Sequence, residues 1–384
     1  MTAATPNAAP TAHASLTDHM LAIRHTLPVH CGLLLRVGDL TISVRTNNDA
    51  LATALRRYFS EFLEPETESG APQTPPDILI TAHETDDREL PFPLPGPFLV
   101  KTPDPGKAKI KEEWLDLPDG RIVRKRITGM HFLFGDAGNV AVGACLANDN
   151  QVINFINNRY LEHMLDRGCL LGHAAGVMHH GRGISLAGFS GMGKSTLALH
   201  LMSKGTTFVS NDRVLLRVNA EEPEGLPTML GIPKQPRINP GTALHNPDLR
   251  DIIAPQDRER FLALSTTDLW HLEHKYDAII EECYGKGRFA LQAPMNALVI
   301  LNWSRTGQPV AVNVVDPLTR RDLLPAFMKS TGLFYRPCSP DYTEPSESAY
   351  AQVLARTTVL EVTGGVDFDA AADICLSFMR TGSL

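Results

Sequence analysis

The sequence predicts an α/β protein with a mostly β amino-terminal domain and a larger α/β domain behind it. Three observations support this prediction. Apolar and polar residues alternate through the first part of the chain, a short apolar run leads through a glycine-rich loop into a helix near its middle, and fully apolar runs follow. With 384 residues, of which 43% are hydrophobic and 21% charged, the chain is long enough for two domains.

We place the domain boundaries from composition and periodicity. Residues 1–20 form a tail, because its first part is rich in Ala, Pro and Thr, a composition typical of disorder. Residues 21–150 form an amino-terminal α+β domain, and residues 151–384 form the second domain.

Each element of the amino-terminal domain has a local signal. Alternation predicts a hairpin with strands at residues 31–37 and 40–45, turned at Gly38 and Asp39. Apolar residues at helical spacing predict an amphipathic helix over residues 48–62. Further strands are predicted at residues 77–82, 121–126, 130–134 and 140–144, before a helix at residues 151–167.

The stretch from Gly188 to Thr196 contains the phosphate-loop pattern G-x-x-x-x-G-K-[ST] at residues 188–195, between a strand predicted at residues 184–187 and a helix predicted at residues 195–202. Backbone N–H groups of such a loop and the positive end of the helix cradle phosphate oxygens. Lys194 is expected to reach the β and γ phosphates, and Ser195 to bind Mg²⁺. The candidate nucleotide-binding residues are Gly188, Ser190, Gly191, Met192, Gly193, Lys194, Ser195 and Thr196.

A carboxylate after the next strand is the expected second magnesium ligand. The charge and glycine of Lys204 and Gly205 end the helix, and residues 206–210 form a strand that delivers Asp212 to the edge of the loop. The alternative for Asp212 is a solvated turn carboxylate.

These residues resemble the catalytic domain of HPr kinase/phosphorylase, a bacterial serine kinase distantly similar to phosphoenolpyruvate carboxykinase. The family's loop, G-x-S-G-x-G-K-S, is matched by residues 188–195. Its histidine ahead of a β hairpin is matched by His173, followed by a hairpin tip at residues 179–183. Its Lys/Arg-Gly pair before paired aspartates is matched by Lys204 and Gly205, then Asn211 and Asp212.

Residues 210–213 and 233–241 further resemble the HPr kinase-related kinase B branch, and the resemblance covers roughly the second half of the chain. It implies a P-loop kinase core of the HPr kinase/phosphoenolpyruvate carboxykinase type. It also implies an ATP- and Mg²⁺-dependent transfer of the γ-phosphoryl group to a hydroxyl, of a protein serine or of a small molecule. Phosphorolysis and assembly into homo-oligomers are further properties that the resemblance suggests.

The sequence departs from the family at two places. The first aspartate of the pair, thought to act on the proton of the acceptor hydroxyl, is Asn211, and an amide cannot accept that proton. His173 is the substitute base, because a neutral imidazole suits this role; the alternative is a satisfied core histidine. This sequence has no clear copy of the family's E-I-R-G-L-G-I segment, which helps to shape the interface with the protein substrate. Its absence weakens the inference that HPr itself is the substrate.

Phosphoryl transfer needs further positive charge around the γ phosphate. Lys234 and Arg237 are candidates, because prolines and glycines stiffen the loop that carries them; the alternative is a solvated connector. Arg288 is a further glycine-framed cation, although nothing in the sequence fixes its distance from the loop. For Arg213, which directly follows Asp212, the alternative is that it only balances the charge of Asp212. The predicted catalytic residues are therefore His173, Lys194, Asp212 and Arg237.

Two functions from different classes compete. The first is the phosphotransferase, whose small-molecule version resembles free-serine kinases. The second is a catalytically impaired ATP-binding sensor or interaction protein, because Asn211 replaces the family's aspartate.

Composition excludes several other classes. A formal net charge of −7 argues against general nucleic-acid binding. No apolar run approaches the roughly 20 residues that span a bilayer, and the first 17 residues lack the pattern of a secretory signal. The six cysteines include no C-x-x-C pair and fit a reducing compartment, so we expect a cytoplasmic protein.

The rest of the second domain shows its own periodicities. Apolar runs at residues 297–301 and 310–315 predict strands suited to a sheet centre. A helix is predicted at residues 320–331, a strand at 358–362, and a closing helix at 367–379.

Overall fold

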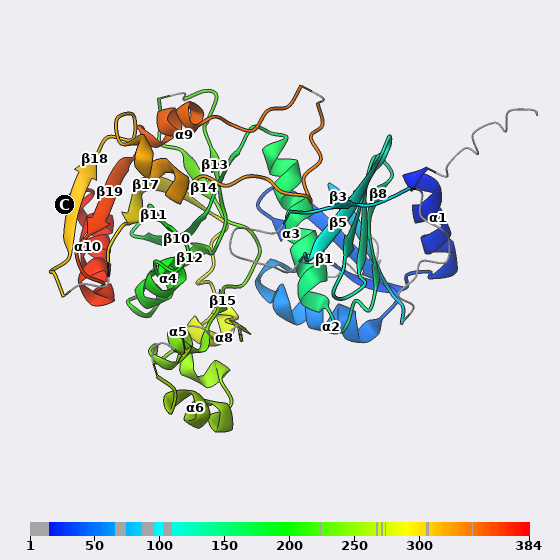
Figure 1. Cartoon of the computed structure of the whole chain (residues 1–384), viewed down its shortest axis with the longest axis horizontal. Helices are drawn as coiled ribbons and strands as arrows, with labels where there is room; N and C mark the ends of the chain where they lie inside the picture. The colour runs from blue at the N-terminus through cyan, green and yellow to red at the C-terminus, as the bar shows by residue number, and fades with distance from the viewer. Residues whose placement is uncertain are drawn as a thin grey trace, which may run out of the picture. The chain divides into compact units, whose positions relative to one another are not determined.

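The computed structural model describes residues 15–65, 74–86, 96–102 and 110–384, apart from residues 223, 266–267, 270–271, 273, 305–306 and 340. Within these residues the protein is a mixed α/β structure with two large mixed sheets (Figure 1). The chain divides into two compact units. The first comprises Met1–Leu34, Ile42–Leu55 and Pro72–Ile156, and the second comprises Leu35–Thr41, Arg56–Ala71 and Asn157–Leu384.

The first large sheet carries eight strands within the described residues, in the order β1-β2-β3-β8-β7-β6-β5-β4. The pairs β2–β3 and β3–β8 are parallel, whereas β4 to β8 pair antiparallel in sequence order. The strands are β1 (Cys31–Val37), β2 (Leu40–Thr46), β3 (Ile78–Glu84), β4 (Leu99–Val100), β5 (Glu112–Leu117), β6 (Gly120–Lys125), β7 (His131–Gly135) and β8 (Gly138–Gly143). The predicted hairpin and the strands near residues 77–82, 121–126, 130–134 and 140–144 are confirmed.

The last residues of the predicted tail are helical. Helix α1 (Leu16–Thr26) starts with a capping box, in which Ser15 and Asp18 bond each other's backbone N–H groups. Its apolar face, which includes Met20, packs in a core cluster with strand residues such as Leu133. The tail predicted over residues 1–20 is therefore wrong from residue 16 onward, and residues 1–14 lie outside the described residues.

The second large sheet carries nine strands within the described residues, in the order β12-β10-β11-β17-β14-β13-β9, with β19 paired to β17 and β18 paired to β19. Its central contacts are parallel, because β17 runs parallel to both β11 and β19. The strands are β9 (Leu170–Gly172), β10 (Ala174–His179), β11 (Arg182–Gly188), β12 (Thr207–Ser210), β13 (Val214–Arg217), β14 (Thr228–Leu230), β17 (Gln292–Leu301), β18 (Ala311–Val315) and β19 (Thr358–Thr363).

Helices and 3-10 turns accompany both sheets. Two short strands, β15 (Arg237–Ile238) and β16 (Tyr276–Asp277), form a separate antiparallel pair. The helical elements are α1, α2 (Asp49–Tyr58), η1 (Ser60–Phe62), α3 (Asp149–Leu165), α4 (Lys194–Ser203), α5 (Pro240–Leu244), η2 (Arg250–Ile252), α6 (Pro255–Leu262), α8 (Ile280–Tyr284), η3 (Arg321–Ala326), α9 (Glu347–Leu354) and α10 (Phe368–Thr381). Among the described helices, none has the length and apolar character needed to cross a membrane.

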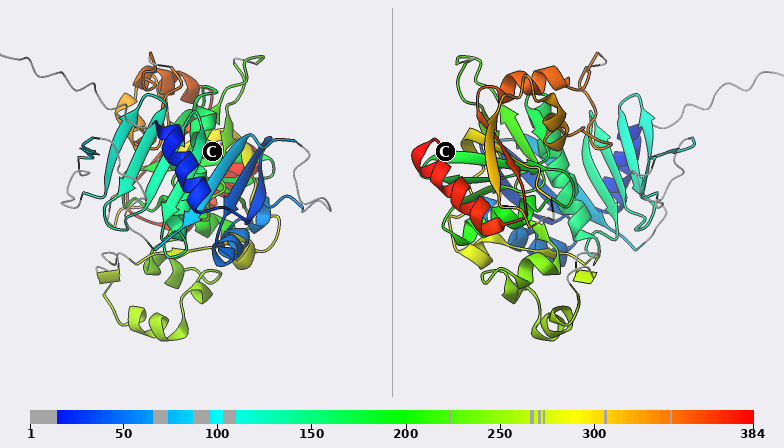
Figure 2. Two further views of the ribbon diagram at one scale, coloured as in Figure 1. Left: turned by 90° about the vertical axis from the view of Figure 1, so that its right-hand side faces the viewer. Right: turned by 60° about the vertical axis from the view of Figure 1, so that its left-hand side comes forward.

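Strand β17 lies at the centre of a three-layer core. Its alternate residues Ala297, Val299 and Leu301 face a cluster with helices α4 and α10, whereas Leu298 and Ile300 face a second cluster with η3 and α9. Figure 1 shows α4 and α9 on opposite sides of these strands, and the right-hand view of Figure 2 brings α10 to the front. The apolar run that predicted this strand is continuous because both faces are buried.

Two predictions for this region need correction. Strand β18 lies at a sheet edge, paired only with β19 among the described residues, and its Val314 is 64% exposed; it is not a sheet-centre strand. The helix predicted over residues 320–331 is only the 3-10 helix η3. Pro325 lacks the N–H that a continuing α-helix needs, and the chain then extends so that Met328 forms a bridge with Gly172. The strand near 358–362 and the closing helix are confirmed as β19 and α10.

Candidate functional site

The phosphate-loop residues connect the end of β11 to the start of α4, as the sequence predicts. Gly188, Gly191 and Gly193 have φ angles of 152°, 83° and 88°, a region that side chains other than glycine rarely adopt. A Cβ atom at Gly193 would also lie 2.6 Å from the ring of Phe368. Both backbone conformation and close packing therefore require glycine at the start of the helix.

Lys194 lies over its own loop. Its Nζ donates to the carbonyl oxygen of Gly188 at 2.7 Å and is 3.4 Å from that of Phe189. Burial lowers the pKa of Lys194, and Lys329 adds to the lowering, while Asp212 opposes it. The amine is thus a half-buried cation held at the loop, with a carboxylate close enough to act on it.

The rest of the loop is held from several sides. The indole of Trp303 donates to the carbonyl of Met192 at 3.0 Å, and the N–H of Met192 donates to Phe189 at 3.2 Å. Ser190 and Gly191 are exposed, and Ser195 is half-buried at the first turn of α4. The Oγ1 atom of Thr196 lies 3.1 Å from that of Thr242, so this hydroxyl already has a partner on α5.

His173 and Asp212 meet beside this loop. His173 follows β9, and its backbone N–H donates to the carbonyl of Phe327, while its Nε2 lies 3.4 Å from Oδ1 of Asp212. Asp212 has a φ of 70°, which is unusual outside glycine and turns the chain sharply after β12. His173 and Asp212 are thus in contact, and Asp212 is close enough to Lys194 to act on the charge of its amine.

The charges around Asp212 favour its ionised form. Burial acts to raise the pKa of Asp212, but the hydrogen bond from His173 and the charges of Arg213 and Lys234 outweigh it, and the pKa is lowered. Lys234 is the reciprocal case, because burial lowers its pKa while Asp212 opposes the change. The carboxylate is therefore negatively charged at neutral pH, with cations on more than one side.

Asn211 presents an oxygen without a partner at the same turn. The residue is only 7% exposed, and among the described residues its Oδ1 has no hydrogen-bond partner. A buried amide oxygen without a partner costs free energy, so this atom marks a place where a ligand or ion would be favourable. Ser195, Asp212 and Asn211 offer a hydroxyl, a carboxylate and an amide oxygen, which is the donor set that Mg²⁺ prefers.

The other predicted cations occupy different places. Nε of Arg237 lies 3.7 Å from Oδ1 of Asp277 on the neighbouring strand, so its charge is already balanced. Arg288 donates to the carbonyls of Met202 and Thr206 at the end of α4 that lies opposite the loop. Arg213 donates to Asn158 at 3.2 Å and has its Nε 3.8 Å from Asp212. Of these three, Arg213 is the one in direct proximity to Asp212.

Lys329 is a site cation that sequence reasoning missed. It influences the pKa of Lys194, although it lies after η3, far along the chain. No local pattern could have indicated it, because the bridge between Met328 and Gly172 is what brings this segment beside His173. Lys329 also lines a cavity of about 270 Å³ with Thr331, Glu344 and Tyr350 among its other walls.

Comparison with known proteins finds a partial structural similarity and no match in sequence. No family model matches the chain, and no curated protein matches it in sequence. Among solved structures, the Hpr(Ser) kinase/phosphatase from Coxiella burnetii matches over 54% of this chain and 88% of that chain, with 9% sequence identity and a TM-score of 0.27. A match at this identity and TM-score establishes neither membership of a family nor an activity.

Proposed function

We propose that the protein is an ATP- and Mg²⁺-dependent phosphotransferase that transfers the γ-phosphoryl group to a hydroxyl. The observation that carries the proposal is the convergence of His173, Asp212 and Lys194 at a strand–glycine loop–helix unit. A loop with helix-terminal N–H groups suits phosphates, and a carboxylate and a histidine beside it suit metal binding and proton transfer.

The nucleotide's phosphates would bind between the loop and the cations. Lys194 can exchange its bond to the carbonyl of Gly188 for phosphate oxygens, because a phosphate is the stronger acceptor for an ammonium group. Lys234 and Lys329 add positive charge from two other segments. Their role is to neutralise the charge that develops on the transferred group.

The metal ion would be held by oxygen atoms of Ser195, Asp212 and Asn211. The unpartnered Oδ1 of Asn211 and the lowered pKa of Asp212 both fit a site that favours a cation. Magnesium would supply charge neutralisation between the β and γ phosphates. In this arrangement Asn211 serves as a metal ligand, so it need not act as the base.

The acceptor hydroxyl would lie on the His173 side. The imidazole can take the hydroxyl proton as transfer proceeds, and Asp212 stabilises the imidazolium that results. A loose transition state requires little assistance from a base, so positioning and charge carry most of the rate. A hydroxyl of a protein serine and that of a small molecule are both compatible with this chemistry.

Transfer of radiolabel from γ-labelled ATP tests the proposal directly. Purified protein is incubated with labelled ATP, Mg²⁺, and either cell lysate or a panel of small hydroxyl compounds. We expect a labelled acceptor with the wild type and none with Lys194→Ala. The matched control is Lys286→Ala, since this lysine is 90% exposed and pairs with Glu281. Equal labelling by the wild type and Lys194→Ala would refute the proposal.

A second candidate is a nucleotide sensor that binds ATP without transferring phosphate. Asn211 favours it, because the position lacks a carboxylate and its amide cannot accept a proton. The variant Asn211→Asp separates the two functions. Under the sensor hypothesis the wild type binds Mg-ATP but labels no acceptor, and the variant gains transfer or hydrolysis. Under the phosphotransferase hypothesis the wild type is already active.

A further inference from the structure

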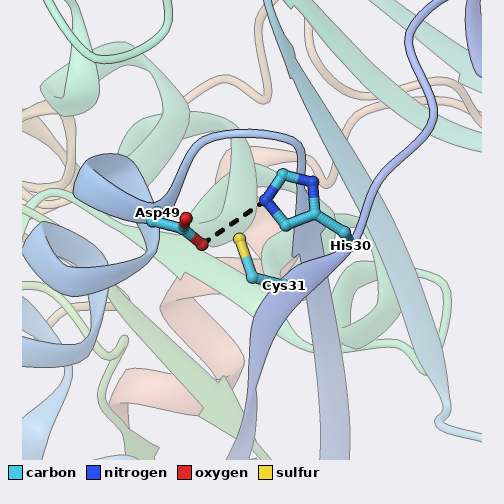
Figure 3. Close-up of side chains that lie close together, drawn as sticks. All are labelled: His30, Cys31 and Asp49. Atoms are coloured by element: carbon cyan, nitrogen blue, oxygen red, sulfur yellow. Dashed lines mark ion pairs between the residues drawn. The ribbon is translucent and has the colours of Figure 1, made fainter.

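Three side chains of different chemistry converge at the start of β1 and the start of α2. His30 precedes β1, Cys31 is its first residue, and Asp49 is the first residue of α2. Their potential ligand atoms all lie within 4.8 Å of one another, and Nε2 of His30 is 3.4 Å from Oδ1 of Asp49. Figure 3 shows the sulfur of Cys31 pointing toward the gap between the imidazole and the carboxylate.

Backbone and capping bonds hold these three residues in place. The N–H of His30 donates to the carbonyl of Thr46 at 3.0 Å, and the Sγ of Cys31 donates to the same oxygen at 3.3 Å. Asn48 accepts from the N–H of Leu51 at 2.9 Å and thereby fixes the first turn of α2, which carries Asp49. The cluster is therefore built on a strand and a capped helix, which limits the movement of its ligand atoms.

We propose that His30, Cys31 and Asp49 bind one Zn²⁺ ion, with water as the fourth ligand. A thiolate, an imidazole and a carboxylate are the ligands that zinc takes, whereas Mg²⁺ and Ca²⁺ prefer oxygen alone. Tetrahedral zinc places neighbouring ligand atoms about 3.3–3.6 Å apart, given its usual bond lengths. The 3.4 Å between His30 and Asp49 already meets this spacing.

Charge and accessibility agree with this assignment. The thiolate and the carboxylate together carry two negative charges, which match the charge of the ion. On binding, Cys31 releases its proton to solvent and gives up its bond to the carbonyl of Thr46. The side chains of His30 and Asp49 are 58% and 83% exposed, so the ion can enter directly and keep a water ligand. Across the described residues, no other group of three such side chains converges as closely.

The three ligands of this site belong to the first unit, whereas His173 and Asp212 of the proposed phosphotransferase site belong to the second. Zinc binding would tie the start of β1 to the start of α2. The ion would leave one coordination position open, as in zinc sites that keep a water molecule.

Metal titration of the full-length, tag-free apoprotein tests the inference. Zn²⁺ is titrated in competition with a chromophoric chelator, and Co²⁺ serves as a spectroscopic probe through its thiolate charge-transfer band. We expect one equivalent of Zn²⁺ and a thiolate band with Co²⁺. Cys31→Ser should abolish the band and weaken zinc binding by at least about tenfold. Loss of a zinc ligand should reduce the affinity at least as much as loss of a residue that only supports a ligand.

Two controls isolate the cluster. Cys338→Ser removes an exposed free cysteine elsewhere in the chain, and His173→Ala alters the proposed phosphotransferase site. Both variants should still bind one equivalent of Zn²⁺ and show the Co²⁺ thiolate band. Asp49→Asn, at an exposed position, should weaken zinc binding without loss of folding, so the test does not depend on the cysteine variant alone. Absence of a stoichiometric equivalent, or an unchanged band in Cys31→Ser, would overturn the inference.

Discussion

The Nε2 atom of His173 lies 3.4 Å from Oδ1 of Asp212, although a β hairpin, the phosphate loop and a helix separate the two residues along the chain. The contact forms because β10 pairs with β12 and places the residue before β10 beside the turn that follows β12. It joins the acceptor side of the proposed site to its metal side through one hydrogen bond.

Removal of the His173 imidazole should slow transfer without weakening nucleotide binding. We expect His173→Ala to lower kcat by about 10²–10⁴-fold, the usual contribution of a general base, with the KM for ATP unchanged. Initial rates of radiolabel transfer measure both parameters. His25→Ala, at an exposed position in the first unit, is the control and should behave as the wild type. An unchanged kcat would assign His173 a structural role.

Loss of the Asp212 charge should weaken metal-dependent nucleotide binding at every pH from 5 to 8. The pKa of this carboxyl is lowered, so the wild type keeps the charge throughout that range. A carboxyl whose pKa is lowered in the folded state stabilises the protein at pH values above its unfolded-state pKa of about 3.9. This stabilisation is lost as the pH falls through the folded-state pKa. Calorimetric titration with Mg-ATP at pH 5.5 and 8 should therefore show a defect in Asp212→Asn at both values and little pH dependence from this group in the wild type. Asp248→Asn, at an exposed turn, should bind normally.

Substitution of Gly193 should disturb the loop more than substitution of a glycine with similar backbone strain. Gly193→Ala imposes both a left-handed conformation and a contact of 2.6 Å with Phe368, whereas Gly205, with a φ of 99°, has nothing within 4 Å of an added Cβ. We expect Gly205→Ala to cost about 1–2 kcal/mol of unfolding free energy, and Gly193→Ala a further 1–3 kcal/mol from overpacking, as order-of-magnitude values. Urea denaturation measures both. Equal losses of unfolding free energy in the two variants would show that the Phe368 ring moves aside without an energetic penalty.

The buried hydroxyl of Tyr350 should contribute to stability, and that of Tyr276 should not. Tyr350 is 2% exposed and donates to the carbonyl of Leu171 at 2.7 Å. Tyr350→Phe leaves that carbonyl without its partner, so we expect a loss of about 1–3 kcal/mol. The hydroxyl of Tyr276 is buried with no partner among the described residues, so Tyr276→Phe should be neutral or stabilising. Thermal melting of the two variants gives the comparison, and a similar loss in both would contradict it.

Glu61 should make the protein less stable as pH rises from 5 to 8. Burial, with a further contribution from Glu281, raises the pKa of Glu61 to about 7, above its ordinary value of 4.5. Between these two pKa values, the folded state binds more protons than the unfolded state. The contribution of Glu61 to stability therefore falls as the pH rises from about 4.5 to about 7 and is constant at higher pH. Glu61→Gln removes the charge, and we expect it to raise the unfolding free energy at pH 8 by about 1 kcal/mol, a value discounted for partial exposure.

Urea denaturation at pH 5 and 8 checks this prediction. The wild type should lose stability between the two values relative to Glu61→Gln, and the exposed Glu259→Gln should follow the wild type. Parallel pH profiles for the wild type and Glu61→Gln would contradict the prediction.

Local patterns predicted the unit that carries the proposed site. The apolar run at residues 184–187 lies within β11, and the helix predicted at 195–202 is α4 with a one-residue difference at each end. These predictions succeed because strand periodicity, helix-capping glycine and the lysine all act within a few residues. Helix α1 had a comparable signal in Ser15 and Asp18, a capping box that the composition of the preceding tail obscured.

Predictions from the sequence were less accurate where contacts between distant segments determine the position of a strand or the partner of a side chain. Residues 310–315 are rich in apolar side chains, as a central strand is, yet among the described strands β18 pairs only with β19, because pairing order depends on the whole sheet. Among the cations, Arg237 has Asp277 as its partner and Arg288 has carbonyls at the end of α4. Neither partner follows from the residues adjacent in the chain.

The sequence alone determined where the strand–glycine loop–helix unit would form and which carboxylate would follow it, since hydrogen bonding, glycine conformation and helix capping act between neighbours. Only the tertiary structure decided which distant groups share that site. Strand pairing places His173 against Asp212 and the segment of Lys329 beside Gly172. It also leaves the Asn211 oxygen buried with no hydrogen-bond partner in the part of the chain that the structure describes. The physical reason is that electrostatic interactions depend on distance in space, and the pairing of strands far apart in the chain, which local sequence does not encode, sets that distance.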